Sequence, residues 1–216
     1  MIINKKVEKI NKDIIERYKE VEPATIGHFR NFGFMSSALK PIFDEIKLVG
    51  TAVTLRIPSM DSTLCHKILE IADEGNIIVV DRCGDSEYAC WGGGVTLAAR
   101  QRHISGAIID GAITDIIEIK KEKFPIYYRS VSALTTKLLG IDGEINTTIQ
   151  CGGVVVNPGD LILGDANGVV VISPKDAEFI LKKALKMQKD EEKLVEKIKE
   201  GEMLAHLSGA DDLIKL

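Results

Sequence analysis

Residues 76–115, NIIVVDRCGDSEYACWGGGVTLAARQRHISGAIIDGAITD, decide the fold class of this chain. Asn76 to Asp81 is a short apolar run without alternation, as expected of a strand covered on both faces. A helix from about Val95 to His103 follows, then a similar run from Ser105 to Asp110 and a further helix that GAITD opens. Strand, helix, strand and helix at this spacing predict a βαβ unit with parallel strands.

The flanking segments extend this unit into a mixed α/β domain. Apolar residues at helical spacing predict an amphipathic helix over 4–20. Further strands are expected at 48–57 and 124–131, with a helix at 62–71 between the first strand and Asn76. Three β runs, Val154–Val156, Asp160–Leu163 and Gly168–Ile172, are separated by turn signals and predict an antiparallel meander. We therefore predict one domain over 1–216, with an N-terminal helix at 4–20, a core at 45–173 and a charged C-terminal helix at 175–202.

Composition bounds the classes of function. The chain has 216 residues, a formal charge of -4, 45% hydrophobic residues and 28% charged residues. This mild acidity argues against nucleic acid as a partner, because phosphate binding needs clustered positive charge. No apolar run reaches the roughly 18 residues of a membrane helix, and the N-terminus lacks the pattern of a signal peptide. We expect a cytoplasmic protein whose four cysteines are free thiols, with no zinc site.

Ligand chemistry is expected at one edge of the predicted sheet. The loops after Asp81 and Asp110 emerge on the same edge, which is where open α/β sheets bind ligands. Gly92, Gly93 and Gly94 open a helix there, and the N–H groups from Gly92 to Val95 favour a carboxylate or phosphate. The alternative is that the glycines only allow a tight turn against Trp91.

Asp115 is the leading candidate for a catalytic and metal-binding residue. A carboxylate facing an anion-binding turn can hold a divalent cation, since Mg²⁺ often takes one or two protein carboxylates and several waters. The alternative is an N-cap formed by Thr114 or Asp115 for its own helix. Weaker candidates on nearby segments are Asp85, Arg82, Asp61 and His66, the last two with a helix-capping or solvated role as the alternative; His28 is a weak acid–base candidate.

Four stretches together resemble a known family. They are PATIGHFRNFGFM, VGTAVTLR, the segment from VVDRCGDSEYACWGGG to GAIIDGAITD, and CGGVVVNPGDLILGDANGVVVIS, in that order. They are similar to the RraA-like proteins (regulators of ribonuclease activity) and the class II 4-hydroxy-4-methyl-2-oxoglutarate aldolases. The resemblance covers roughly residues 20 to 205.

The resemblance implies a layered β/β/α fold like a swivelling domain, and ring-shaped trimers that sometimes stack as hexamers. It also implies active sites at subunit clefts and lyase chemistry on small 2-oxo or hydroxy acids: retro-aldol cleavage and oxaloacetate decarboxylation. In the aldolases Mg²⁺ or Mn²⁺ polarises the 2-oxo acid and stabilises the pyruvate enolate, as a Lewis acid does where negative charge develops.

Only part of the aldolase motif carries over. Asp115 and the amides around Gly92 to Val95 match it, with Asp115 implied as the metal ligand. Thr114 stands where the aldolases have an arginine, and Gly93 stands where they have an acidic residue. Thr114 cannot replace the bidentate carboxylate clamp of a guanidinium. Two hypotheses follow: a metal-dependent lyase in which Thr114 and Asp115 contact the substrate and metal, or a non-catalytic RraA-like regulator that acts through protein contacts.

Overall fold

Four parallel strands form the centre of the molecule in the computed structural model, which describes residues 1–5, 7–58 and 60–214. They are β3 (Lys47–Arg56), β4 (Asn76–Asp81), β5 (Gly106–Ile113) and β6 (Ile126–Val131), adjacent in this order. All three of their pairings are parallel. The predicted βαβ unit is therefore confirmed.

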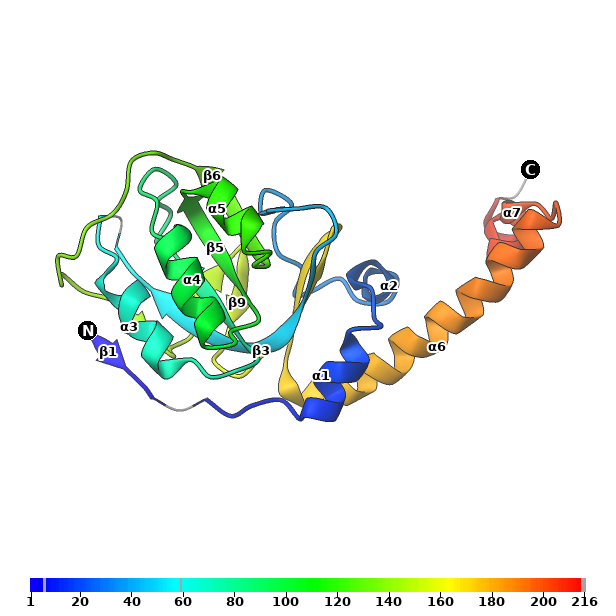
Figure 1. Ribbon diagram of the computed structural model, residues 1–216. Coiled ribbons are helices and arrows are strands. Elements are labelled where there is room, and N and C mark those ends of the chain that lie inside the picture. Colours follow the sequence, from blue (N-terminus) through cyan, green and yellow to red (C-terminus); the bar gives the residue numbers. More distant parts are fainter. Residues whose placement is uncertain (6, 59, 215–216) are drawn as a thin grey trace.

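Helices cover one face of this sheet and a β-hairpin covers the other. On the helical face lie α3 (Thr63–Ile71), α4 (Gly93–Gln101) and α5 (Ile116–Lys121), as Figure 1 shows. Successive side chains of a strand point to opposite faces, so Ile78 packs with the helices while Ile77 packs with β8 (Ile149–Cys151) and β9 (Val154–Val156). The expected α/β class and β/β/α layering are confirmed.

Shorter strands extend both edges of the sheet. The hairpin β10 (Leu161–Asp165) and β11 (Gly168–Ile172) joins the first half of β3 in antiparallel register. The end of β3 pairs with β7 (Glu144–Ile145), which pairs with β1 (Ile2–Ile3), and β2 (Lys40–Pro41) pairs with β6. The predicted meander is wrong in its pairing, because β9 pairs with β8 and not with β10.

The predicted helix over 4–20 is wrong in its first half. Only α1 (Lys12–Tyr18) is helical, and Lys6 lies outside the described residues. Asn4 instead exchanges hydrogen bonds with Asn146, and the N–H of Ile10 donates to Thr51 Oγ1 at 3.1 Å. The segment before α1 therefore runs along the sheet, because these tertiary hydrogen bonds outweigh a short helix's weak intrinsic preference.

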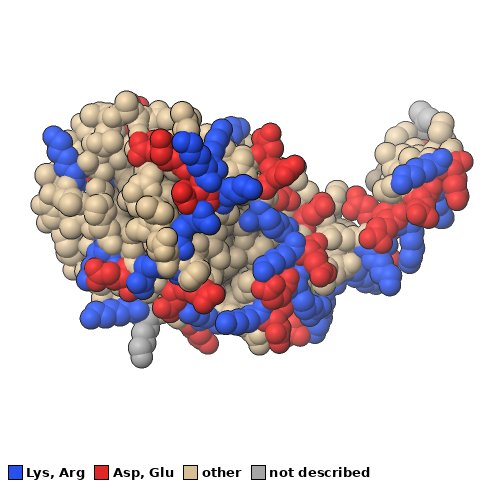
Figure 2. Space-filling view, in the orientation of Figure 1, with Lys and Arg blue, Asp and Glu red and all other residues tan. Residues whose placement is uncertain are grey.

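The C-terminal helix projects from the body. α6 (Pro174–Lys199) begins at the predicted proline and packs against α1 and α2 (Pro23–Gly27) through its first half, and Gln188 still bonds to the carbonyl of Glu20. Its second half, with α7 (Leu204–Ser208) and α8 (Ala210–Leu213), extends away from the sheet in Figure 1. Figure 2 shows acidic and basic side chains interspersed along this extension. Among the described residues no helix is both long and apolar enough to cross a bilayer.

Candidate functional site

The end of β5 and the loop before α4 are hydrogen-bonded side by side. The N–H of Cys90 donates to the carbonyl of Ala112 at 3.2 Å, and the N–H of Thr114 donates to the carbonyl of Trp91 at 2.9 Å. β5 therefore continues through Ile113, and the prediction that GAITD opens a helix is corrected: α5 begins only at Ile116. These bonds bring the glycine turn against Thr114 and Asp115.

Trp91 fixes the position of the loop before α4. Its ring is fully buried and stacks on Phe124 with the ring centroids 6.0 Å apart. Its Nε1–H donates to the buried Thr96 Oγ1 at 2.9 Å, which ties the loop to the first turn of α4. The residue before the glycines is thus fixed by packing and by a satisfied hydrogen bond, so the turn has a defined position.

Asp115 connects the two helices that begin at this edge. It has left-handed backbone geometry, with φ of 52°, at the N-cap position of α5, but its side chain makes no capping bond to α5. Its Oδ2 instead accepts the N–H of Gly93 at 2.9 Å, at the start of α4. The prediction of a cap for its own helix is therefore wrong. Its other oxygen, Oδ1, lies 3.4 Å from Thr114 Oγ1, and the residue is exposed.

Part of the glycine turn is already in contact with Asp115 and is not free for a ligand. A side chain at Gly92 would displace the Asp115 carboxylate, because a Cβ there would lie 2.5 Å from Asp115 Oδ2. The N–H of Gly93 is occupied by the aspartate, whereas the N–H groups of Gly94 and Val95 belong to a first helical turn that supplies them no acceptor. The predicted anion pocket is thus reduced to the amides of Gly94 and Val95.

A cavity of about 370 Å³ opens in front of Asp115. It brings together five predicted residues, Gly92, Gly94, Val95, Thr114 and Asp115, and also His66 from α3. The other lining residues come from α3 and its start, the loop before α4, α4 itself and the segment after β6: Ser62, Leu69, Ala89, Cys90, Trp91, Ala98, Thr135 and Thr136. Hydroxyl groups, one imidazole and one carboxylate therefore face a mainly apolar floor.

Three weaker candidates have structural roles away from the cavity. Asp61 is 1% exposed and accepts hydrogen bonds from Thr63 N and Oγ1, Leu139 N and Ile141 N. Burial by itself would raise the pKa of Asp61, but these hydrogen bonds lower it to about 2. Its carboxylate therefore fastens the segment after β6 to the start of α3, and the predicted acid–base role is not supported.

Arg82 and Asp85 stabilise the loop after β4. The Arg82 side chain is fully buried, donates to the carbonyls of Pro58 and Tyr88, and lies 3.6 Å from Asp85 Oδ1. The same oxygen of Asp85 accepts the N–H of Tyr88 at 2.9 Å. Neither residue reaches the cavity, so their predicted site roles are corrected.

No arginine takes the place of the guanidinium that Thr114 lacks. Arg100 pairs with Glu122 at 2.7 Å on the helical surface, and Arg129 pairs with Asp110. Asp110 also accepts the N–H of Gly152, which makes it a structural carboxylate rather than part of the site. Within the described part of the chain, then, the cavity has no arginine in its lining.

Sequence reasoning missed several residues at this site. Ser62, Thr135 and Thr136 add hydroxyl groups to the cavity, and the last two arrive from a segment with no motif of its own. Glu118 lies against the turn: a Cβ built on Gly93 would be 3.2 Å from Glu118 Cβ. Its position three residues after Asp115 was the available signal, because it places Glu118 in the first turn of the helix that Asp115 precedes.

Asp115 is the one carboxylate that lines the cavity in the described part of the chain. No cluster of three or more His, Cys, Asp or Glu side chains suited to a metal occurs among residues 1–5, 7–58 and 60–214. That donor set does not suit zinc, which needs several protein ligands. Mg²⁺ and Mn²⁺ accept oxygen ligands, and Mg²⁺ keeps several waters, so Asp115 Oδ1 with Thr114 Oγ1 beside it is a compatible donor pair.

Comparison with known proteins identifies the family. The family model RraA-like, described as Aldolase/RraA, matches residues 13–171. A protein of Halalkalibacterium halodurans named "Putative 4-hydroxy-4-methyl-2-oxoglutarate aldolase" is 41% identical over 158 residues, which is 73% of this chain and 75% of that protein. The chain therefore belongs to the RraA-like family.

Solved structures support the same fold. An uncharacterized protein from Pseudomonas syringae superposes with a TM-score of 0.81 at 20% identity, covering 95% of this chain and 97% of that one. Streptomyces coelicolor RraAS2, described as an unusual member of the RNase ES inhibitor RraA protein family, superposes with a TM-score of 0.76 at 22% identity, covering 86% and 96%. Relatives thus include proteins named as aldolases and proteins named as ribonuclease inhibitors.

Proposed function

We propose that this protein is a divalent-metal-dependent lyase that cleaves or decarboxylates a small 2-oxo or hydroxy acid in the cavity beside Asp115. The observation that carries the proposal is the fixed position of Asp115. Its Oδ2 is held by Gly93 N–H at 2.9 Å, and its Oδ1, beside Thr114 Oγ1, is the second oxygen of a residue that lines the cavity. A carboxylate oriented in this way is prepared to bind a cation without reorganisation.

Different residues at this site would bind the substrate, hold the metal and exclude water. The free N–H groups of Gly94 and Val95 would bind the substrate carboxylate, helped by the positive end of the α4 dipole. Asp115 and Thr114 would hold Mg²⁺ or Mn²⁺. A bound metal supplies a Lewis acid that stabilises the enolate formed when the carbon–carbon bond breaks. Trp91 and Leu69 would exclude water from the floor.

His66 is the residue best placed to move a proton. It is the one imidazole lining the cavity among the described residues, and it comes from α3, on the wall formed with Leu69. After the carbon–carbon bond breaks, the enolate carbon needs a proton, and imidazole is suited to donate one near neutral pH. We therefore assign His66 as the proton donor and Asp115 as the metal ligand.

Among the described residues no arginine lines the cavity, and this limits the kinds of acid that the cavity would bind. A second carboxylate on the substrate would lack a bidentate partner, since Ser62, Thr114 and Thr135 offer only hydroxyl groups. A compact acid such as oxaloacetate, whose second carboxylate leaves as CO₂, suits this lining better than a longer substrate with a persistent second carboxylate.

A neighbouring subunit would complete the cavity. The segment 131–141 after β6 exposes Val131, Leu134, Leu138, Leu139 and Ile141, each at least 45% accessible. Figure 2 shows few charged side chains over the corresponding side of the molecule. An apolar surface of this kind is typical of a protein interface, and the same segment supplies Thr135 and Thr136 to the cavity. We propose a homo-oligomer, a trimer or hexamer, with this segment at the subunit contact.

The test is pyruvate release from oxaloacetate by the purified protein with Mg²⁺, measured above the metal-only background. We expect turnover that falls at least about 100-fold in Asp115→Asn, because removing one ligand and one fixed charge costs several kcal/mol of transition-state stabilisation. Asp44→Asn is the matched control, since Asp44 is exposed and lies outside the cavity, and it should retain activity. No turnover on oxaloacetate or on other small 2-oxo acids would contradict the lyase proposal and favour the regulatory alternative.

A further inference from the structure

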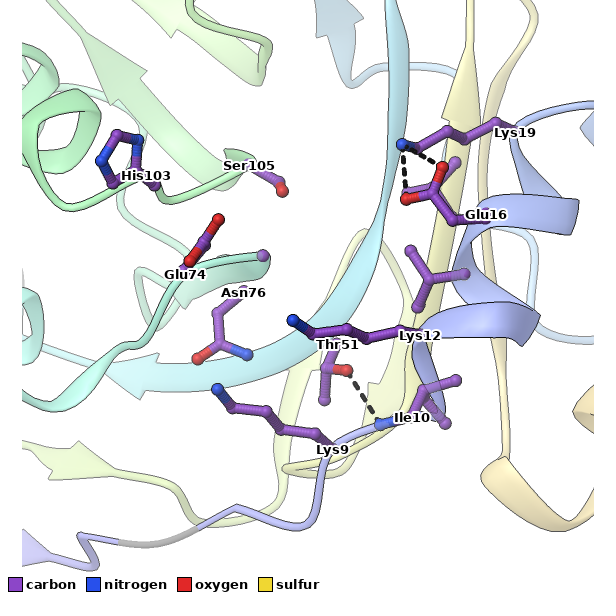
Figure 3. A pocket seen from close by; sticks show the side chains of 13 residues that line it. Lys9, Ile10, Lys12, Glu16, Lys19, Thr51, Glu74, Asn76, His103 and Ser105 are labelled. Atoms are coloured by element: carbon purple, nitrogen blue, oxygen red, sulfur yellow. Dashed lines mark hydrogen bonds and ion pairs between the residues drawn. The ribbon is translucent and has the colours of Figure 1, made fainter.

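A second cavity lies at the other end of the central parallel strands, where β4 and β5 begin. It has a volume of about 350 Å³ and is bounded by the segment Lys9–Lys19 on one side and by the loops entering β4 and β5 on the other (Figure 3). β5 separates it from the Asp115 cavity by about 25 Å, at 3.3 Å per strand residue. It is therefore independent of the proposed lyase site.

The floor of this cavity is a row of polar side chains from the middle of β3, the start of β4 and the residue before β5. Thr51 of β3 and Asn76 of β4 are register partners, and Ser105 before β5 donates its N–H to the Asn76 carbonyl at 2.8 Å. Polar side chains are unusual at such central positions, because burying them costs free energy unless they are hydrogen-bonded. Thr51 is only 4% exposed and Asn76 only 3%.

The amide of Asn76 offers an unused donor to this cavity. Its Oδ1 accepts the N–H of Asp73 at 2.8 Å, which fixes the orientation of the amide and leaves Nδ2 as the donor on the cavity side. Nδ2 donates to no acceptor among the described residues. The Thr51 hydroxyl accepts the N–H of Ile10 at 3.1 Å, and its own proton likewise has no acceptor in the described part of the chain. Two residues that are almost fully buried thus each keep an unused side-chain donor at the cavity.

Charged groups above this floor are only partly neutralised. Lys9 pairs with Asp73 at 3.0 Å and Lys19 pairs with Glu16 at 2.7 Å. Lys12 extends toward Asn76 in Figure 3, and across the chain as described it has no ion-pair partner. Glu74, also without an ion-pair partner there, lies on the opposite wall with His103 and Ser105.

We propose that this cavity binds a small hydroxylated oxyanion, a molecule with one phosphate or carboxylate group and adjacent hydroxyl groups. Lys12, Asn76 Nδ2 and the Thr51 hydroxyl would bind the acid group, since all three donate and one is cationic. Glu74 accepts hydrogen bonds from the hydroxyl groups of the ligand, and Ser105 offers a further hydroxyl. The carboxylates of Glu74 and Glu16 also repel an acid group placed on their side, which gives the ligand one orientation.

Calorimetric titration of the full chain tests the site with four probes. Glycerol 3-phosphate and glycerate carry both features, inorganic phosphate lacks the hydroxyl groups, and glycerol lacks the acid. We expect saturable binding of at least one of the first two with a dissociation constant of about 1 mM or tighter, and binding at least about fivefold weaker for phosphate and for glycerol. The tighter of the first two probes identifies the acid group.

Two variants locate the binding. Lys12→Met keeps the alkyl chain, removes the charge and should weaken binding about tenfold, while Arg17→Met, an exposed cation on the same helix outside the cavity, should change it less than about twofold. The side-chain amide signals of Asn76 in nuclear magnetic resonance spectra should shift on titration. Asp115→Asn should leave the affinity unchanged.

Three results would overturn the proposal. They are an absence of saturation by either hydroxylated probe up to about 20 mM, equal affinity in Lys12→Met and the parent protein, or phosphate binding as tightly as glycerol 3-phosphate. Because Lys12 is exposed at the first position of α1, its replacement leaves the fold intact, so a lost affinity reports on the site.

Discussion

At the scale of single residues, Asp115 shows how one carboxylate can join the starts of two helices and still line a cavity. Its left-handed backbone and its bond to Gly93 join the starts of α4 and α5. Asp and Asn tolerate the left-handed region better than other residues with side chains, so the position restricts which residues can stand there. The sequence pattern singled out Asp115, but it did not predict that the side chain of Asp115 bonds to the start of α4.

Gly92 is predicted to be required for the orientation of Asp115. In Gly92→Ala the new Cβ would lie 2.5 Å from Asp115 Oδ2 and 2.9 Å from Thr114 Cγ2, which forces both side chains to move. We expect a loss of free energy of unfolding of about 1–3 kcal/mol and at least about tenfold lower lyase activity. Gly27→Ala is the control: Gly27 lies in α2, outside the cavity, a Cβ there would make only an ordinary contact with Phe34 at 3.8 Å, and activity should be retained. Equal losses in both variants would contradict this role.

Asp61 is predicted to make stability depend on acid pH. Its folded-state pKa of about 2 lies below the ordinary value of 3.8, so its ionised form stabilises the fold above about pH 4, and this contribution is lost as the pH falls toward 2. The difference corresponds to about 2 kcal/mol. In urea unfolding, Asp61→Asn should be less stable than the parent near pH 6, with a smaller difference near pH 2.

Asp44 provides the comparison for this pH effect. It is exposed, and no hydrogen bond to its side chain occurs in the described residues. Asp44→Asn should therefore match the parent protein at every pH within about 0.5 kcal/mol. A stability difference for Asp61→Asn that does not change between neutral and acid pH would contradict the assignment.

At the scale of elements, α6 has two halves with different energetic roles. Tyr18 and Gln188 fasten its first part to the N-terminal helices through hydrogen bonds to the carbonyls of Ala177 and Glu20, of 2.7 and 2.8 Å. Burial dominates the environment of the Tyr18 hydroxyl and raises its pKa. Beyond Gln188 the helix projects from the body (Figure 1). Stability should depend on the first half only.

Two truncations to alanine test this division. Leu181 is fully buried between α6 and the β10–β11 hairpin, and Leu181→Ala should lower the free energy of unfolding by about 2–4 kcal/mol because it leaves a cavity. Val195 is 39% exposed on the projecting half, so Val195→Ala should change the free energy of unfolding by less than about 0.5 kcal/mol. Thermal unfolding measured for both proteins gives the comparison, and similar losses would refute a division of the helix.

At the scale of the whole molecule, the surface after β6 is expected to decide assembly. Leu138 is 63% exposed within the apolar segment 131–141. Leu138→Asp should convert the oligomer to smaller species in native mass spectrometry, because a desolvated charge in an apolar interface is costly. Phe32→Asp, at a residue 79% exposed outside that segment, should keep the parent assembly. An unchanged mass for Leu138→Asp would exclude this surface as the contact.

Local pattern was sufficient for the strands that form the core. β4, β9 and β11 lie where the apolar runs predicted them, because a short β-branched run between turn residues has few alternatives to a buried strand. The segment before α1 shows the limit of this reasoning. Val7 and Ile10 have helical spacing, yet the structure uses Ile10 in an extended segment hydrogen-bonded to Thr51.

The sequence by itself determined the mixed α/β class, the parallel βαβ unit whose loops emerge at one edge of the sheet, and the presence of Asp115 beside a glycine turn. Hydrophobic periodicity and the direction of parallel strands determine these features locally. Only the tertiary structure decided that Asp115 caps α4, that Arg82 and Asp61 are structural, and that Thr135 joins the cavity. Such roles depend on hydrogen bonds between segments far apart in the chain, and a local pattern contains no information about those partners.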